Sequence, residues 1–171
     1  ALPLLPQGTY YVRVSRADSD AMLNGQYQVQ LTEESFTTQA QGGDTCALAS
    51  PVFASGSFSG VFDGSANDYS PDDGPAASCT GFSSNGNDVV YSINMGANET
   101  LTATLVGDND TALYLVTDCA DVNGTCLDGS DSGNPDTITY TATSPIQVFL
   151  IADQYSSSST TGAYTVTIDL Q

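Results

Sequence analysis

The sequence contains no histidine, no lysine and no tryptophan, and its two arginines stand against 20 acidic residues. Without histidine there is no imidazole base, no Ser-His-Asp or Cys-His nucleophile and no histidine-ligated zinc. Without lysine there is neither a Schiff base nor a P-loop lysine. A chain with a formal charge of −18 also repels nucleic acid and anionic membrane surfaces. These absences favour a protein that is not an enzyme.

The residues that are present favour a folded, strand-rich and secreted protein. Hydrophobic residues make up 40% of the 171 positions, and nine tyrosines with six phenylalanines supply aromatic side chains that a disordered acidic tail lacks. Most of the acidic residues are aspartates, which prefer turns and caps. No apolar run approaches the roughly 20 residues that span a bilayer. Four cysteines predict two disulfides and a secreted, extracellular or cell-surface location, with four reduced structural thiols as the alternative.

Alternation of apolar and polar residues predicts many short strands. The apolar runs at 112–116 and 146–151 predict central strands, and the turn signals between strands recur at the spacing of an all-β sandwich. No helix of three turns is expected, and 52–61 is expected to hold at most one short irregular element. The predicted strands are 9–14, 25–31, 88–93, 100–105, 112–116, 137–142, 146–151 and 163–168.

An internal repeat divides the chain unevenly. Residues 8–14 and 25–31 read GTYYVRV and GQYQVQL, and they resemble residues 145–151 and 162–168, which read PIQVFLI and GAYTVTI. A closing hairpin therefore occurs twice, whereas the strands that precede it occur once. We expect an N-terminal β-hairpin arm over 1–33, a linker over 34–45 and a sandwich over 46–171.

Several stretches of the sandwich resemble the bacterial pre-peptidase C-terminal domain in its cysteine-containing form. The stretches are GDTCA at 43–47, NDVVYS at 87–92, ETLTAT at 99–104, DTALYL at 110–115, Asp118-Cys119, Cys126, ITY at 138–140 and the closing strand 162–168. The resemblance implies a non-catalytic, jelly-roll-like antiparallel β-sandwich that is appended to secreted hydrolases or repeated in surface proteins. It also implies that the arm is the tail of a preceding domain of this kind.

The same resemblance implies a disulfide pairing, Cys46 with Cys79 and Cys119 with Cys126, which is one of three connectivities. The short separation of Cys119 and Cys126 is consistent with a bridge across one turn. A bridge between Cys46 and Cys79 would tie the strand-poor stretch 50–87 to the sandwich.

Clusters of aspartate in turns are candidate calcium ligands, because hard cations take oxygen donors. None of the clusters matches the EF-hand spacing. The alternative is that these side chains form Asx-turns and a hydrated, mutually repelling surface. No cofactor is required by the sequence, and calcium is the metal that it favours. The better candidates are Asp108, Asp110, Asp128 and Asp131.

The arm is the most informative feature, because two isolated strands are only marginally stable and expose an edge. Both arginines lie in it, while residues 44–171 hold 16 acids and no base. Three outcomes stay open: the arm completes a preceding domain of a longer chain, packs on its own sandwich, or adds to the sheet of another subunit. The candidate assembly residues are Tyr10, Tyr11, Val12, Arg13, Val14, Arg16, Tyr27, Val29 and Leu31.

The sequence therefore predicts a non-catalytic structural or adhesion module. Its sandwiches would assemble head-to-tail, as an extracellular filament or a tandem-repeat surface protein, through strand donation by the arm. The expected partners are identical subunits or adjacent repeats. The alternative is a carbohydrate- or protein-binding accessory module of a secreted enzyme, calcium-dependent in one form, with surface tyrosines such as Tyr69 and Tyr155 stacking on a glycan.

Overall fold

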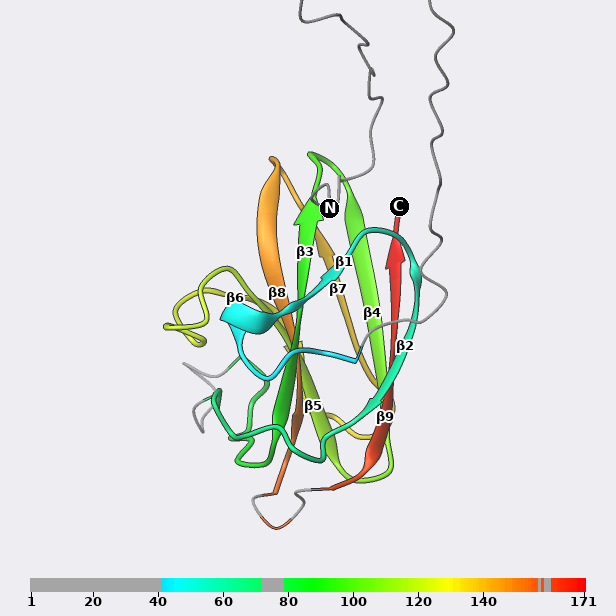
Figure 1. Ribbon diagram of the computed structural model, residues 1–171. Helices are drawn as coiled ribbons and strands as arrows, with labels where there is room; N and C mark the ends of the chain where they lie inside the picture. The colour runs from blue at the N-terminus through cyan, green and yellow to red at the C-terminus, as the bar shows by residue number, and fades with distance from the viewer. Residues whose placement is uncertain (1–40, 72–78, 157, 159–160) are drawn as a thin grey trace, which may run out of the picture. The chain divides into compact units, whose positions relative to one another are not determined.

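The described part of the chain is a two-layered β structure (Figure 1). The computed structural model describes residues 41–71, 79–156, 158 and 161–171. A short 3-10 helix, η1 (Cys46–Leu48), precedes the strands. The strands are β1 (Ser50–Val52), β2 (Gly56–Val61), β3 (Asp88–Met95), β4 (Thr100–Gly107), β5 (Thr111–Val116), β6 (Cys126–Ser130), β7 (Asp136–Thr141), β8 (Ile146–Gln154) and β9 (Ala163–Leu170).

The strands form two sheets, with the order β1-β3-β8-β5-β6 in the five-stranded sheet and β2-β9-β4-β7 in the four-stranded sheet. Neighbouring strands are antiparallel, except that β1 runs parallel to β3. The chain changes sheet at nearly every connection. The predicted all-β sandwich is confirmed.

Six predicted strands between 88 and 168 are confirmed, each with bounds shifted by a few residues. The central positions predicted for 112–116 and 146–151 are also confirmed, because β8 and β5 lie inside the five-stranded sheet and every residue of β5 is buried. Three strands were missed. β1 has three residues, β2 is rich in serine and glycine, and β6 reads CLDGS. Such sequences have low strand propensity, so tertiary pairing decides their conformation.

The space between the sheets holds the main core. The inward side chains of β3, β5 and β8 meet those of β4, β7 and β9, and these side chains are almost completely removed from solvent. Tyr91 on β3 and Tyr164 on β9 join the two sheets through a buried hydroxyl contact of 3.1 Å. The ring of Tyr91 also lies against Phe58 of β2, with centroids 5.5 Å apart.

Part of the outer face of the five-stranded sheet is buried as well. Val90, Tyr114, Val116 and Ile151 form a second apolar cluster there. Loops rather than strands cover this cluster, including η1, the segment around Tyr69 and the β5–β6 loop with Val122. The hydroxyl of Tyr69 accepts the N–H of Cys46 at 2.8 Å, so two covering segments hold each other.

Two disulfides hold this covering layer, and the implied pairing was wrong. Cys46 bonds Cys119, and Cys79 bonds Cys126. The turn between Cys119 and Cys126 needs no bridge, because backbone bonds such as Thr117 N–H to Thr125 O already close it. Each cysteine of that turn instead fixes a different loop, one at η1 and one at Cys79.

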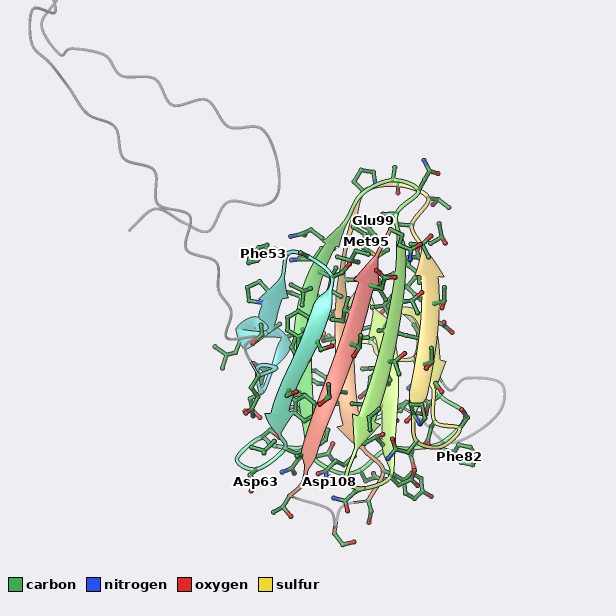
Figure 2. The ribbon with its side chains drawn as sticks, turned by 90° about the vertical axis from the view of Figure 1, so that its right-hand side faces the viewer. Phe53, Asp63, Phe82, Met95, Glu99 and Asp108 are labelled. Atoms are coloured by element: carbon green, nitrogen blue, oxygen red, sulfur yellow. A yellow bond between two sulfur atoms is a disulfide. The ribbon has the colours of Figure 1, made fainter. Side chains whose placement is uncertain are left out.

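The outer face of the four-stranded sheet is different: it is solvent-facing and almost uncharged (Figure 2). Its outward side chains are largely serine and threonine, which pair across strands at 2.9–3.4 Å. Asp169 is the one charged residue among the outward positions of these four strands. The hydroxyl pairs are Ser57–Thr167, Ser59–Thr165, Thr100–Thr141, Thr102–Thr139 and Thr104–Thr137.

The body begins before Cys46, because the last part of the predicted linker is already packed on it. Gly42 donates its N–H to the hydroxyl of Tyr164 at 3.0 Å, and Gly43 forms a two-way backbone bridge with Val90. A Cβ on Gly42 would lie 2.8 Å from the Cβ of Val89, so only glycine fits this close approach. The predicted arm, 1–33, and residues 34–40 of the linker lie outside the described residues.

Removal of either disulfide is expected to destabilise the fold strongly. The bridges close loops with sequence separations of 73 and 47 residues. For loops of this length, the chain-entropy relation gives about 4 kcal/mol each. The paired variants Cys46→Ser with Cys119→Ser and Cys79→Ser with Cys126→Ser should therefore lose comparable unfolding free energy in denaturant titrations. A loss below about 1 kcal/mol in both would contradict a covering layer that depends on these bridges.

Candidate functional site

The four candidate calcium ligands do not form one ligand set. Among residues 41–71, 79–156, 158 and 161–171, no group of three or more acidic or cysteine side chains is arranged to hold a metal. Asp108 accepts the N–H of Ala163 at 3.0 Å. Asp128 accepts the N–H groups of Gly129 and Thr139 at 3.0 and 2.8 Å. These two carboxylates therefore have structural roles, but their bonds to Ala163 and Thr139 join residues far apart in the chain and are not the Asx-turns of the alternative interpretation.

The other two candidates, Asp110 and Asp131, lie close enough to interact electrostatically. Burial raises the pKa of Asp131 to about 6, with smaller contributions from Asp110 and Asp136. Its Oδ2 is buried without a hydrogen-bond partner among the described residues. The Asp136 carboxylate accepts hydrogen bonds from the hydroxyls of Thr111 and Ser130 and from the N–H of Ser132. Calcium binding stays a prediction from the sequence, and these residues do not fit it as a single site.

A buried carboxyl pair, which sequence analysis missed, lies under the covering loops. Asp88 on β3 and Asp153 on β8 are register partners, and both have no exposed surface. Oδ2 of Asp88 accepts the N–H groups of Asp68 and Tyr69 at 2.8 and 2.9 Å. Oδ2 of Asp153 accepts the hydroxyl of Tyr114 at 2.9 Å. The second oxygen of each carboxyl is buried and has no partner among the described residues.

No cation within the described residues compensates this pair, since the chain has no lysine or histidine and both arginines precede residue 41. Burial raises the pKa of Asp88 to about 7, although its two N–H donors act in the opposite direction. Burial, followed by the neighbouring Asp88, raises the pKa of Asp153 well above the usual range of a carboxyl group. The pair therefore holds protons in the fold at a pH where exposed aspartates have lost theirs.

The edge of β2 is the other notable feature. Phe62 donates its N–H to Gly162 O, so the even-numbered residues of β2 bond with β9 and the odd-numbered ones direct their backbone groups outward. Among the described residues, the side chain of Gln41 meets this edge at one end, where its Nε2 donates to Val61 O at 2.6 Å. The backbone groups of Ser57 and Ser59 form the rest of the open edge.

The opposite edge of the four-stranded sheet is partly closed. There, the outward N–H of Thr139 on β7 is bonded to the Asp128 carboxylate of β6, which links the two sheets. In the five-stranded sheet, the edge strands β1 and β6 have three and five residues, and Gly129 of β6 is pressed against Cys79. β2 is thus the longest edge without such a bond along its middle.

The two tyrosines considered for glycan stacking have different environments. Tyr69 is half-buried in the covering layer and bonded to Cys46, so its ring is part of the packing. Tyr155 is 43% exposed and lines a polar hollow of about 420 Å³ with Asn67, Ser83, Asn85 and Ser156. The described residues contain no helix of the length and apolarity that a membrane crossing needs.

Comparison with known proteins finds similarity to solved structures at the level of the fold. No protein-family model and no curated protein matches the chain. The pre-peptidase C-terminal domain of a collagenase from Bacillus anthracis is 13% identical, with a TM-score of 0.48 over 70% of this chain and 93% of that domain. PliG of Aeromonas hydrophila, a periplasmic inhibitor of g-type lysozyme, is 11% identical, with a TM-score of 0.48 over 71% of this chain and 95% of the inhibitor.

The family whose motifs the sequence resembles is thus represented among the similar solved structures. At these identities and TM-scores, the likenesses carry no argument about function. The location of the protein rests on its own chemistry: two disulfides point to an extracellular or periplasmic environment.

The buried carboxyl pair predicts a stability that falls as pH rises. The native state keeps protons that the unfolded chain has released, so the unfolding free energy decreases between the ordinary aspartate pKa of 3.8 and the raised pKa of about 7. A difference of one in pKa between the folded and unfolded states corresponds to about 1.4 kcal/mol, which makes the loss on the order of a few kcal/mol. Denaturant titrations from about pH 4 to about pH 8 measure it.

The variant Asp153→Asn isolates the pair, because the amide oxygen still accepts the Tyr114 hydroxyl while one ionisable group is gone. This variant should show a smaller decrease with pH and a higher stability than the parent at about pH 8. Asp169→Asn removes the same charge from a half-exposed position outside the pair and is the control for the loss of one negative charge. Equal slopes for the parent and Asp153→Asn would contradict the assignment.

Proposed function

We propose that the chain is a non-catalytic structural module of an extracellular assembly, joined to identical subunits or adjacent repeats by strand donation from residues 1–33. The observation that carries the proposal is the completeness of the body. Residues 41–171 supply both faces of the main core, and its side chains are buried. This burial supports the interpretation that the strands predicted at 9–14 and 25–31 are surplus to the sandwich, and an isolated hairpin is marginally stable.

Charge supports the same proposal. Residues 44–171 carry 16 acidic groups and no basic group, so two bodies repel each other. Residues 1–33 contain Arg13 and Arg16 against three acidic residues, which leaves this segment nearly neutral. A nearly neutral segment can approach the body at a lower electrostatic cost than a second body can.

Deletion of residues 1–33 tests the proposal. We expect the full chain to form species larger than one chain, and the truncated chain to have the mass of a single chain by light scattering while circular dichroism still reports a β fold. If both chains give the same mass at every concentration, strand donation by the arm is excluded.

A matched pair of substitutions tests whether the apolar side of the arm makes the contact. In the predicted strand 25–31, Tyr27, Val29 and Leu31 share one side, and Gln26, Gln28 and Gln30 share the other. Val29→Asp should abolish the larger species, because it introduces a charge on the side that would be buried. Gln28→Asp adds the same charge one residue away and should preserve them. Equal effects of the two variants would contradict the predicted alternation.

The uncharged hydroxyl face supports a second candidate function, the binding of a neutral polysaccharide as an accessory module. The face spans all four strands of its sheet and offers hydroxyl donors and acceptors, with Asp169 as its one charged side chain. Under this candidate, the protein should co-sediment with an insoluble neutral glucan, and Thr104→Lys should reduce the bound fraction severalfold. Gln147→Lys, on the other sheet, is the control. Absence of co-sedimentation of the parent protein would remove this candidate.

A further inference from the structure

We propose that the open edge of β2 is the acceptor for the segment 25–31 of a second copy, which adds to the four-stranded sheet as a fifth strand. This inference rests on the proposed assembly and identifies the surface that it uses. Three features of the molecule support it: the side-chain pattern of each sheet, the backbone groups of each edge, and the distribution of charge.

The side-chain pattern of residues 25–31 matches one sheet and not the other. In the five-stranded sheet, β5 is buried on both faces, since all six of its residues are buried. Strands of the four-stranded sheet alternate between the core and an outer face of uncharged polar residues. Residues 25–31 alternate in the same way, with glutamine on the polar side. As a fifth strand, this segment would extend both the core and the uncharged face.

The backbone of β2 offers the required hydrogen bonds. The N–H and C=O groups of Ser57 and Ser59 are directed away from β9, as the register with Phe62 and Gly162 establishes. Because alternate residues of an edge strand exchange bonds with an added strand, these two residues are the docking positions. β2 has six residues and the segment has seven, so the two strands are of similar length.

The surroundings of the edge favour an apolar strand. Phe53, which precedes β2 (Figure 2), is 42% exposed. Phe58 is only partly buried, although it contacts Tyr91 in the core. Tyr27, Val29 and Leu31 of an added strand would cover apolar surface of this kind. Neither β2 nor the segment 25–31 contains a charged residue, so their pairing buries no charge.

The second edge of the same sheet serves as the internal comparison. In β7, the outward N–H of Thr139 is already bonded to Asp128, which leaves less of this edge for an incoming strand. Thr141 has the same outward backbone direction, because Ala142 bonds with Glu99 on the β4 side. A proline at Thr141 therefore alters the β7 edge in the way that a proline at Ser59 alters the β2 edge.

The test uses the full chain with Ser59→Pro, Ser57→Pro or Thr141→Pro. Proline at an outward position removes one N–H from the open edge and none from the ladder with the neighbouring strand. We expect either serine variant to weaken association by about tenfold or more in a light-scattering dilution series, with the melting temperature near that of the parent. Thr141→Pro should associate as the parent does. Two serine variants are used so that a local folding defect in one of them does not decide the result.

The outcomes separate this inference from the proposed function. If deletion of 1–33 abolishes association while Ser57→Pro and Ser59→Pro do not, the assembly stands and the β2 edge is excluded as the acceptor. Loss of association in Thr141→Pro alone would assign the acceptor to β7. If the parent is a single chain and the serine variants only melt earlier, the edge is occupied by the chain's own arm, which overturns the inference.

Discussion

Burial of the five-stranded sheet on both faces is the constraint on which the rest of the structure depends. A sheet buried on one face needs only a second sheet, but here Val90, Tyr114, Val116 and Ile151 would face solvent without a third layer. Loops supply that layer, and loops have little cohesion of their own. Both disulfides therefore begin where β5 and β6 are joined, at Cys119 of the connection and at Cys126, the first residue of β6, and they extend to Cys46 and Cys79. The bridges take the place of a helix or strand layer, which the described residues 62–71 and 79–87 do not form.

The covering layer also explains why two carboxyl groups are buried without a cation. Asp88 is the acceptor for two consecutive N–H groups of the segment over the sheet, at Asp68 and Tyr69. These two hydrogen bonds attach the covering segment to β3. The Asp88 carboxyl thus holds the loop, and its proximity to Asp153 raises the pKa of Asp153. The protonation state of the pair and the attachment of the loop are consequently linked.

Sequence analysis predicted the strands in which apolar and polar residues alternate and the strands that are continuously apolar. Residues 100–105 and 163–168 alternate because one side of each strand is solvated, and 112–116 is continuously apolar because both sides are covered. It could not predict β2 or β6, whose serine, glycine and aspartate residues are ordered by neighbouring strands. The cysteine pairing failed because separation along the chain says little about which loops meet on the outer face. The pair Asp88 and Asp153 was missed for the same reason: it exists only through the β3–β8 register.

The position of Gln41 constrains how copies of this chain can be connected. Its backbone O accepts the Ser50 hydroxyl of β1 and its side chain bonds Val61 of β2, so the chain enters the body at the seam between the two sheets. The donor's exit and the proposed acceptor edge are therefore adjacent on one body. Residues 32–40 span roughly 30 Å at most, which limits how far from this seam the segment 25–31 of the same chain could pair. Under the proposal, the added strand would make the same contacts whether it came from the same chain or from another, as in domain swapping. Concentration and the strain in this connecting segment, rather than new contacts, would then determine whether the edge is filled within one chain or between two.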